Sequence, residues 1–256
     1  MKENRSLQVA ISCLNDGALR LSFLDDLDYL VVHQVTNNQD YSLFQSKLPD
    51  NVTYKQVFGA GLSKSRNLLL DEAHADFIWI MDDDVQIDSC AKQYLNRLIE
   101  QYSDCALISV SHAQTPLATP LNVKAKKLNR ITAASVSSID MLLQPKALQG
   151  VRFNENFGLG AKYPIGEEYI FICDLLRSGA KAIRCNYVCS YHPEASSGSD
   201  FFSTTNKLIA KREMFKTALG PYKGMFFYIA FLIKKFPILI RHGKFGVIWR
   251  SLLCRQ

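Results

Sequence analysis

Short apolar runs alternate with polar, turn-prone segments along the first half of the chain. Four of these runs are rich in β-branched and aromatic residues and long enough for buried strands, at 7–13, 29–35, 52–57 and 77–81. Two segments between them, 19–27 and 63–74, have helical character, and Ser63 is a suitable N-cap for the second. This alternation predicts an α/β fold, with a mostly parallel, Rossmann-like central sheet flanked by helices.

The pattern continues less regularly in the second half. Strand character returns at 105–111, 136–143 and 182–190. Ser89 is expected to cap one helix, which runs to about Gln101. Another helix is expected from Gly166 to Arg177, with two glutamates in its first turn and Gly179 past its end. Residues 115–130 contain two prolines and several basic residues, and we expect an irregular excursion there.

Charge divides the chain into two parts. From Asn206 onward there are eleven Lys and Arg residues and one acidic residue, Glu213, so this segment has a charge of +10. Because the net charge of the whole chain is +6, residues 1–205 have a charge of −4. We therefore expect an α/β domain over 1–205 and a basic, amphipathic C-terminal helical tail over 206–256, which meet different partners.

The tail is also strongly apolar. Its runs 224–233 and 236–240 are separated by Lys234 and Lys235, and neither run reaches the length of about 20 residues needed to cross a bilayer. Aromatic residues with flanking cations are typical of a segment that lies in the interface of an anionic membrane. A helix packed on the core is the alternative, whereas the many aliphatic residues argue against a nucleic-acid partner.

Composition and the cysteine pattern indicate the class of protein and the cellular compartment in which it works. Hydrophobic residues make up 48% of the chain, as in a globular protein with a sizeable core. The seven cysteines form no C-x-x-C pair, so neither a zinc site nor a disulfide framework is indicated. Because the N-terminal residues lack the apolar core of a signal peptide, we expect a cytoplasmic protein, peripheral at the inner face of the cytoplasmic membrane.

The strongest candidate for chemistry is the acidic end of the fourth predicted strand. The run 77–81 leads directly into Asp82, Asp83 and Asp84, and ligands of open α/β sheets bind at the carboxyl ends of strands. Three adjacent carboxylates repel one another unless a cation or water lies between them. A metal site and a solvated acidic turn both fit this cluster.

The order of motifs resembles the inverting family-2 glycosyltransferases with the GT-A fold. Ser65-Arg66-Asn67 on a helix precedes the strand that ends in three aspartates, and a Gly166-Glu167-Glu168 helix start precedes a strand that ends at His192. The resemblance covers roughly residues 7–200. It implies a nucleotide-sugar-binding half over 1–111 and an acceptor half over 112–205.

The resemblance also implies roles for individual residues. It places Asp84 on a divalent cation, Mn²⁺ or Mg²⁺, with Asp82 and His192 as further ligands. Asp82 could instead face the ribose, and Arg66 could approach the diphosphate or brace the aspartates. The residues expected to bind the donor are Asn15, Asn37, Arg66, Asp82 and Asp83.

The general base is expected in the Glu167-Glu168 pair. A carboxylate within hydrogen-bond reach can take the proton of the attacking hydroxyl, and Glu168 matches the family's base position better than Glu167. The chain departs from the family twice: the second glutamate replaces an aspartate, and Thr36-Asn37-Asn38 replaces the usual polar signature after the second strand. Two glutamates that merely favour the helix dipole are the alternative.

These features predict a metal-dependent inverting glycosyltransferase of surface polysaccharide synthesis. Its partners would be a nucleotide-sugar donor, a glycan or polyprenyl-linked glycan acceptor, and an anionic membrane surface reached by the tail. A sugar-phosphate nucleotidyltransferase is one alternative, although Leu14-Asn15-Asp16-Gly17-Ala18 lacks the glycine-rich, basic loop that such an enzyme carries after its first strand. A non-catalytic, membrane-associated glycan-binding protein is the other.

Overall fold

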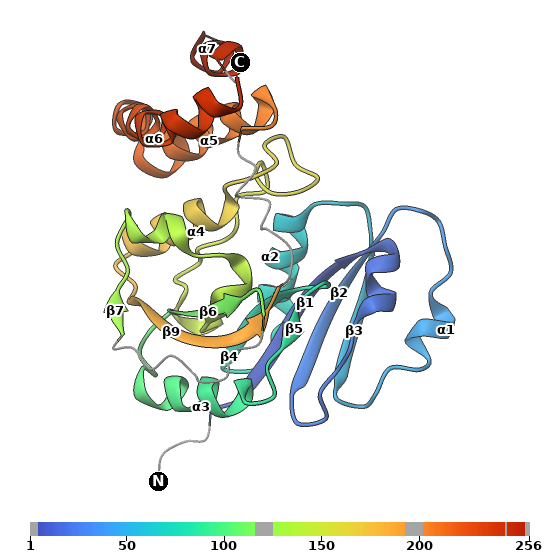
Figure 1. Cartoon of the computed structure of the whole chain (residues 1–256). Coiled ribbons are helices and arrows are strands. Elements are labelled where there is room, and N and C mark those ends of the chain that lie inside the picture. Colours follow the sequence, from blue (N-terminus) through green and yellow to red (C-terminus); the bar gives the residue numbers. More distant parts are fainter. Residues whose placement is uncertain (1–4, 116–124, 193–201, 244, 254–256) are drawn as a thin grey trace.

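The fold is built on one mixed sheet. The computed structural model describes residues 5–115, 125–192, 202–243 and 245–253, and the predicted excursion at 115–130 lies mostly outside these ranges. The strands are β1 (Leu7–Leu14), β2 (Asp28–Val35), β3 (Val52–Phe58), β4 (Phe77–Asp82), β5 (Gln86–Ile87), β6 (Leu107–Ala113), β7 (Lys126–Lys127), β8 (Met141–Leu143) and β9 (Ala182–Tyr191). The α-helices are α1 (Ser42–Gln45), α2 (Leu62–Glu72), α3 (Ala91–Gln101), α4 (Glu167–Arg177), α5 (Thr205–Leu219), α6 (Pro221–Arg241) and α7 (Phe245–Leu253) (Figure 1).

The strand order of the nine-stranded sheet is β3-β2-β1-β4-β8-β6-β9-β5, with β7 paired to β9. The pairs within β3-β2-β1-β4 and the pair β6-β9 are parallel, whereas β8 is antiparallel to both of its neighbours. The prediction of a mostly parallel α/β sheet flanked by helices is therefore confirmed.

Both faces of the sheet are covered, as the apolar runs require. Alternate residues of a strand point to opposite faces, so Ile78 and Ile80 of β4 pack with α2 and α4, while Trp79 and Met81 pack with α3. The whole run from Phe77 to Met81 is buried. This double coverage explains why β4 reads as a continuous hydrophobic run that ends abruptly at the aspartates.

Three expectations about local structure were wrong. The predicted helix at 19–27 is absent: the 3₁₀ helix η1 (Asn15–Arg20) ends at Arg20, and residues 21–27 form a loop. In that loop the Leu24 amide donates to the Tyr29 hydroxyl, and the Asn51 amide donates to the carbonyls of Leu24 and Leu27. These tertiary hydrogen bonds occupy backbone groups that a helix would have paired internally.

The two predicted N-caps are not caps. Helix α2 is preceded by Gly61, and the Ser63 hydroxyl donates instead to the Phe157 carbonyl at 2.6 Å. Cys90 rather than Ser89 precedes α3. The third wrong expectation is the strand at 136–143: only Met141–Leu143 is extended, preceded by the 3₁₀ helices η2 (Thr132–Ser135) and η3 (Ser138–Asp140), while η4 (Pro145–Ala147) follows it.

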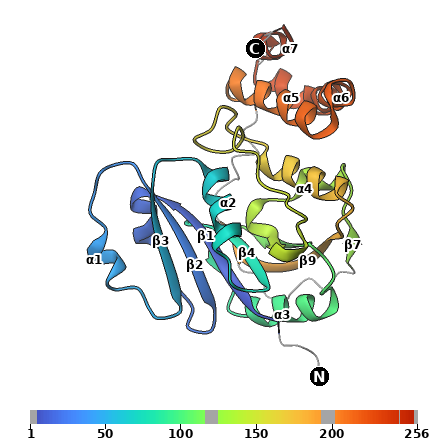
Figure 2. The ribbon, with the colours of Figure 1, turned by 180° about the vertical axis from the view of Figure 1, so that it is seen from behind.

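The predicted C-terminal helical region is present as a layer of α5, α6 and α7 beyond α4, at the top of Figure 1 and seen from behind in Figure 2. Its inner side joins the main core through Leu208, Phe215, Tyr228 and Leu232. The Tyr228 hydroxyl lies 2.6 Å from the hydroxyl of Ser251, which ties α6 to α7. Among the described helices, none combines the length and the apolar character that a membrane crossing requires.

Helices α5 and α6 cross at backbone distance. A Cβ on Gly224 would lie 2.4 Å from both the Lys216 Cα and the Phe215 carbonyl oxygen. Real side chains do not approach a backbone so closely, so this crossing depends on glycine.

We predict that Gly224→Ala lowers the free energy of unfolding by about 1–3 kcal/mol, the usual cost of overpacking. Helix propensity alone would favour alanine by about 1 kcal/mol, so the sign of the effect tests the crossing. Gly246→Ala on α7 is the matched control because no atom lies within 4 Å of its added Cβ. Denaturant midpoints of the three proteins measure the effect, and equal destabilisation by both substitutions would contradict the close crossing.

Candidate functional site

A cavity of about 910 Å³ opens at the carboxyl edge of the sheet. Its walls come from the ends of β1, β4, β6 and β9 and from the N-terminal parts of α2 and α4, and α5 closes one side. Ligands of α/β proteins bind at this edge. Seven of the nine predicted site residues line the cavity: Arg66, Asp82, Asp83, Asp84, Glu167, Glu168 and His192.

Arg66 joins the two sides of the cavity. Its side chain is 1% exposed, and its guanidinium donates to Asp82 Oδ1 at 3.1 Å, to Glu167 Oε1 at 3.1 Å and to the Ser138 hydroxyl at 2.8 Å. Glu168 Oε1 lies 3.8 Å from Nη1, and the guanidinium carbon lies 5.7 Å from the Phe153 ring centre. A planar guanidinium carries five donors in a rigid fork and so holds several partners in a fixed geometry, whereas a lysine ammonium has three donors on a flexible chain.

Glycines let the surrounding loop reach this cluster. A Cβ on Gly158, whose φ is +102°, would come within 3.0 Å of the Ser63 hydroxyl and 3.2 Å of the Glu167 carboxyl carbon. Gly166 precedes α4 with a left-handed φ of +112°, so the helix begins directly at Glu167. The loop that contains Gly158 and the acidic start of α4 therefore both lie against α2, at Ser63 and at Arg66 respectively.

The two glutamates have different surroundings. Glu167 is buried, and burial, assisted by the charge of Glu168, raises its pKa to about 7 although Arg66 opposes the shift. Its Oε2 has no hydrogen-bond partner among the described residues. Glu168 is 24% exposed and lies on the cavity wall, so it is the glutamate that a ligand reaches more easily.

The three aspartates also differ. Asp82 is held by Arg66, and Asp83 accepts a hydrogen bond from Arg20 Nη2 at 3.0 Å. Burial raises the pKa of Asp83, and a Cβ on Gly17 would lie only 1.7 Å from its Oδ2, so a side chain at position 17 would displace this carboxylate. Asp84 is 48% exposed and its Oδ2 lies 3.3 Å from His192 Nε2.

The Asp84–His192 pair is the best place for a cation. Among the described residues, no three His, Cys, Asp or Glu side chains converge as a complete metal site. Two protein ligands nevertheless suit Mg²⁺ or Mn²⁺, which take their remaining oxygens from substrate phosphates and water.

The two remaining predicted residues do not line the cavity. Asn15, with a φ of +48°, accepts a hydrogen bond from the Thr36 amide at 2.8 Å and donates to its hydroxyl, which joins the ends of β1 and β2. Asn37 donates to the Tyr41 hydroxyl at 2.9 Å. Both side chains shape the loops beside the cavity.

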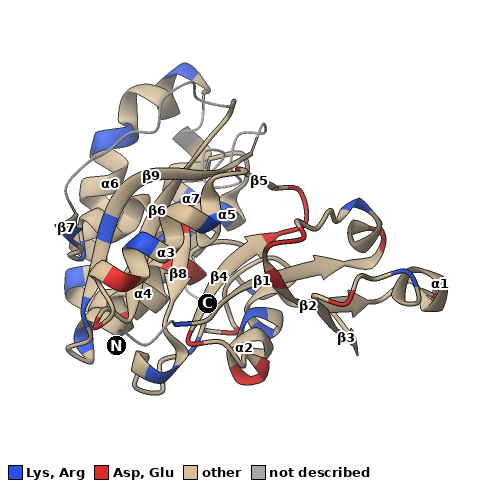
Figure 3. Cartoon of the chain, turned by 90° about the horizontal axis from the view of Figure 1, so that it is seen from below, with Lys and Arg blue, Asp and Glu red and all other residues tan. Residues whose placement is uncertain are grey.

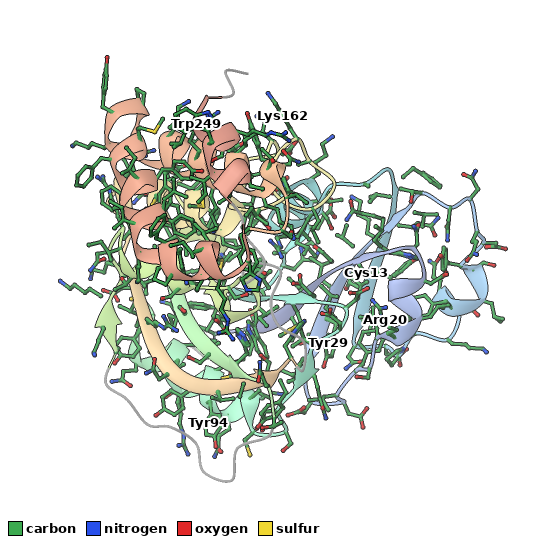
Figure 4. The ribbon with its side chains drawn as sticks, turned by 45° about the horizontal axis from the view of Figure 1, so that its top comes forward. Cys13, Arg20, Tyr29, Tyr94, Lys162 and Trp249 are labelled. Carbon is green, nitrogen blue, oxygen red and sulfur yellow. The ribbon has the colours of Figure 1, made fainter. Side chains whose placement is uncertain are left out.

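Sequence reasoning missed several polar residues of the cavity, among them Arg20, Ser138, His112 and Lys211. Arg20 binds Asp83, Ser138 binds Arg66, and His112 Nδ1 lies 2.9 Å from Asp140 Oδ1, a bond that raises the pKa of His112. Lys211 comes from α5, in the region expected to be a separate tail. Only His112 carried a usable signal, its position at the end of a predicted strand. Figure 4 labels Arg20, and the acidic residues that follow β4 can be traced in Figure 3.

Comparison with known proteins adds evidence on the fold. No protein-family model matches the sequence, and no characterised protein matches it at the sequence level. Among solved structures, S. aureus TarS 1–349 superposes with a TM-score of 0.57 at 14% identity, over 83% of this chain and 65% of that one. The same fragment in complex with UDP-GlcNAc gives the same TM-score and identity over 66% of its length.

The mannosyltransferase PcManGT from Pyrobaculum calidifontis, in complex with GDP-Man and Mn²⁺, superposes over the whole of this chain and 77% of its own, with a TM-score of 0.60 at 12% identity. This chain spans about two thirds of the length of the TarS fragment. The sheet order, the flanking helices and these superpositions show that the chain has a GT-A-like glycosyltransferase fold.

Proposed function

We propose that this protein is a metal-dependent, inverting glycosyltransferase of the family-2 type, acting in surface polysaccharide synthesis. It would transfer a sugar from a nucleoside-diphosphate sugar to a glycan or polyprenyl-linked glycan. The observation that carries the proposal is one cavity with Asp84 and His192 on one side and the Arg66-bound glutamates on the other. The nucleotide sugars in the superposed structures, and the Mn²⁺ in one of them, support it.

The donor belongs at the strand-end side. Asp84 and His192 would hold Mn²⁺ or Mg²⁺, which, when bound, offsets the charge that grows on the departing diphosphate. Asp82 and Asp83 are held by Arg66 and Arg20, so their positions are defined before a donor arrives. Asn15 and Asn37 would act on the donor through the β1 and β2 loops that they hold in place.

The acceptor belongs beside the glutamates. In the proposed step the acceptor hydroxyl attacks the anomeric carbon, its proton passes to the Glu168 carboxylate, and the bond from that carbon to the diphosphate oxygen breaks. Attack opposite the leaving group inverts the configuration, through an oxocarbenium-like transition state. Exposure favours Glu168 as the base, while Glu167, bonded to Arg66, orients the guanidinium.

The proposed membrane contact is the outer face of α6. Tyr222, Phe226, Ile229, Ile233, Phe236 and Ile240 are all exposed and recur at alternating spacings of four and three residues. At 3.6 residues per turn this spacing makes one continuous stripe, which we call the α6 stripe.

Cations follow one flank of the α6 stripe. Lys223, Lys234 and Arg241 are exposed, and their separations of eleven and seven residues place them on one side of the helix. Trp249, labelled in Figure 4, adds an exposed aromatic ring on α7. An apolar stripe flanked by cations fits the interface of an anionic membrane, with the protein peripheral to it on the cytoplasmic side.

The metal assignment predicts that Asp84→Ala lowers transfer by about 10²-fold or more, because losing a few kcal/mol of charge stabilisation costs a factor of ten per 1.4 kcal/mol. A screen of nucleotide sugars for thermal stabilisation, with and without Mn²⁺, identifies the donor. In Asp84→Ala the Mn²⁺-dependent part of that stabilisation should disappear. Asp25→Ala, on the exposed β1–β2 connection, is the control. Unchanged metal dependence and turnover in a folded Asp84→Ala protein would contradict the assignment.

The base assignment predicts that Glu168→Gln lowers the rate of transfer by about 10²–10⁴-fold while donor affinity stays the same. The amide keeps the shape of the side chain but cannot accept the proton. Glu167→Gln is the matched control, since its amide oxygen can still accept the Arg66 hydrogen bond, and its effect should be smaller. Single-turnover rates decide: if the larger loss falls on Glu167→Gln, Glu167 is the base.

The membrane assignment predicts that Phe226→Gln with Ile233→Gln weakens binding to anionic vesicles by about tenfold or more, because apolar insertion is lost. Point substitutions are preferable to truncation because α6 also supplies Tyr228 and Leu232 to the core. Leu43→Gln with Phe58→Gln is the control, as both are exposed apolar residues on the body. Co-sedimentation measures binding, and added salt should weaken it without abolishing it. Equal loss in both double variants would contradict the role of the α6 stripe.

A further inference from the structure

The C-terminal helical layer contributes a side chain to the cavity. Helix α5 crosses the start of α4 closely: a Cβ on Gly166 would lie 2.7 Å from Met214 Cγ, and the rings of Tyr169 and Phe215 are 5.4 Å apart. Lys211 lies one turn before this crossing and lines the cavity together with Glu167 and Glu168. The layer therefore forms part of the cavity wall.

Lys211 differs from the other basic side chains of that wall. Arg66, Arg20, His112 and His192 each face a carboxylate, of Asp82, Asp83, Asp140 and Asp84 respectively. Among the described residues Lys211 makes no ion pair, and its Nζ lies 3.9 Å from Met214 Sδ, a weak acceptor. Within the described part of the chain, its ammonium group therefore has a weak sulfur acceptor and no carboxylate partner.

The electrostatic surroundings leave room for an additional anion. Burial lowers the pKa of Lys211, and the nearby charges of Glu168 and Glu167 oppose this shift only in part. Arg66 already offsets the glutamates, and the raised pKa of Glu167, about 7, reduces its negative charge near neutral pH. An enclosed ammonium without a close counter-ion is costly, and a bound anion removes that cost.

We propose that Lys211 forms an anion-binding subsite next to the glutamates, and that the acceptor carries a phosphate or carboxylate group near the hydroxyl that attacks. The assignment to the acceptor rests on the proposed function, because it takes Glu168 as the base and the Asp84 side as the donor side. The ammonium group can donate up to three hydrogen bonds to such an oxyanion.

Two sources could supply the anion. One is the phosphate of a lipid-linked acceptor, which the α6 stripe on the same helical layer would bring to this end of the protein. The other is the carboxylate of an acidic sugar. The chemistry that Lys211 recognises is the same in both cases, so separate probes are needed.

Trace acetylation of the full chain tests the subsite without any turnover. Only the neutral amine reacts, and an anion bound to Lys211 raises its pKa and shields it. Methyl phosphate, glucuronate and glucose are compared at equal ionic strength, and mass spectrometry reads each lysine. We expect at least one anion to reduce acetylation of Lys211 about tenfold, which one pKa unit would produce, and glucose to have no effect.

Two lysines of the same layer are internal controls. Lys216 is paired with Glu213, and Lys223 is exposed on α6. Protection by methyl phosphate alone supports the subsite and identifies a phosphate source, and protection by glucuronate alone supports it and identifies an acidic sugar. Protection by both supports it for either source. Failure of both anions to protect Lys211, or equal protection of the two controls, overturns it. Failure of the nucleotide-sugar screen, in contrast, overturns the proposed function.

Discussion

The buried guanidinium of Arg66 is the interaction on which the cavity depends. It connects α2 to the end of β4, to η3 and to the start of α4, through Asp82, Ser138 and Glu167. A buried cation is tolerated only where such partners replace water, and removing one partner of a buried pair typically costs about 3–5 kcal/mol. The carboxylates that bind Arg66 therefore have a structural role in addition to any chemical one. For this reason neighbouring aspartates, and the two neighbouring glutamates, differ in their partners and in their exposure.

The difference between neighbouring carboxylates follows from this arrangement. Asp82 and Glu167 face Arg66 from the strand end and the helix start. Asp84 is more exposed than Asp82, and Glu168 is more exposed than Glu167. The Arg66 cluster thus provides a fixed support, and the same cavity is lined by two more accessible carboxylates, an arrangement suited to holding two reactants at once.

The C-terminal layer has three distinct surfaces. The inner side of α5 and α6 packs on the core, the outer side of α6 carries the exposed stripe, and the middle of α5 places Lys211 in the cavity wall. Charge composition identified this region as different from the rest of the chain. Its contribution to the cavity depends on the close crossings at Gly166 and Gly224, which composition does not reveal.

The sequence by itself determined the strands β1, β2, β3, β4, β6 and β9, the helix α4 and the strand-end aspartates, because periodicity and turn residues act over a few positions. It also singled out Arg66, Glu167, Glu168 and His192, through the order of motifs. It misjudged 19–27 and Ser63, where hydrogen bonds to Asn51 and to the Phe157 carbonyl replaced the local preference. It also placed the cap of α3 at Ser89, one residue before Cys90. Tertiary structure alone decided that Arg66 pairs with Glu167, although the two residues lie 101 positions apart in the chain. It also decided that His112 and Lys211 line the same cavity. Those choices depend on burial and on contacts between segments far apart in the chain, and no local pattern encodes either.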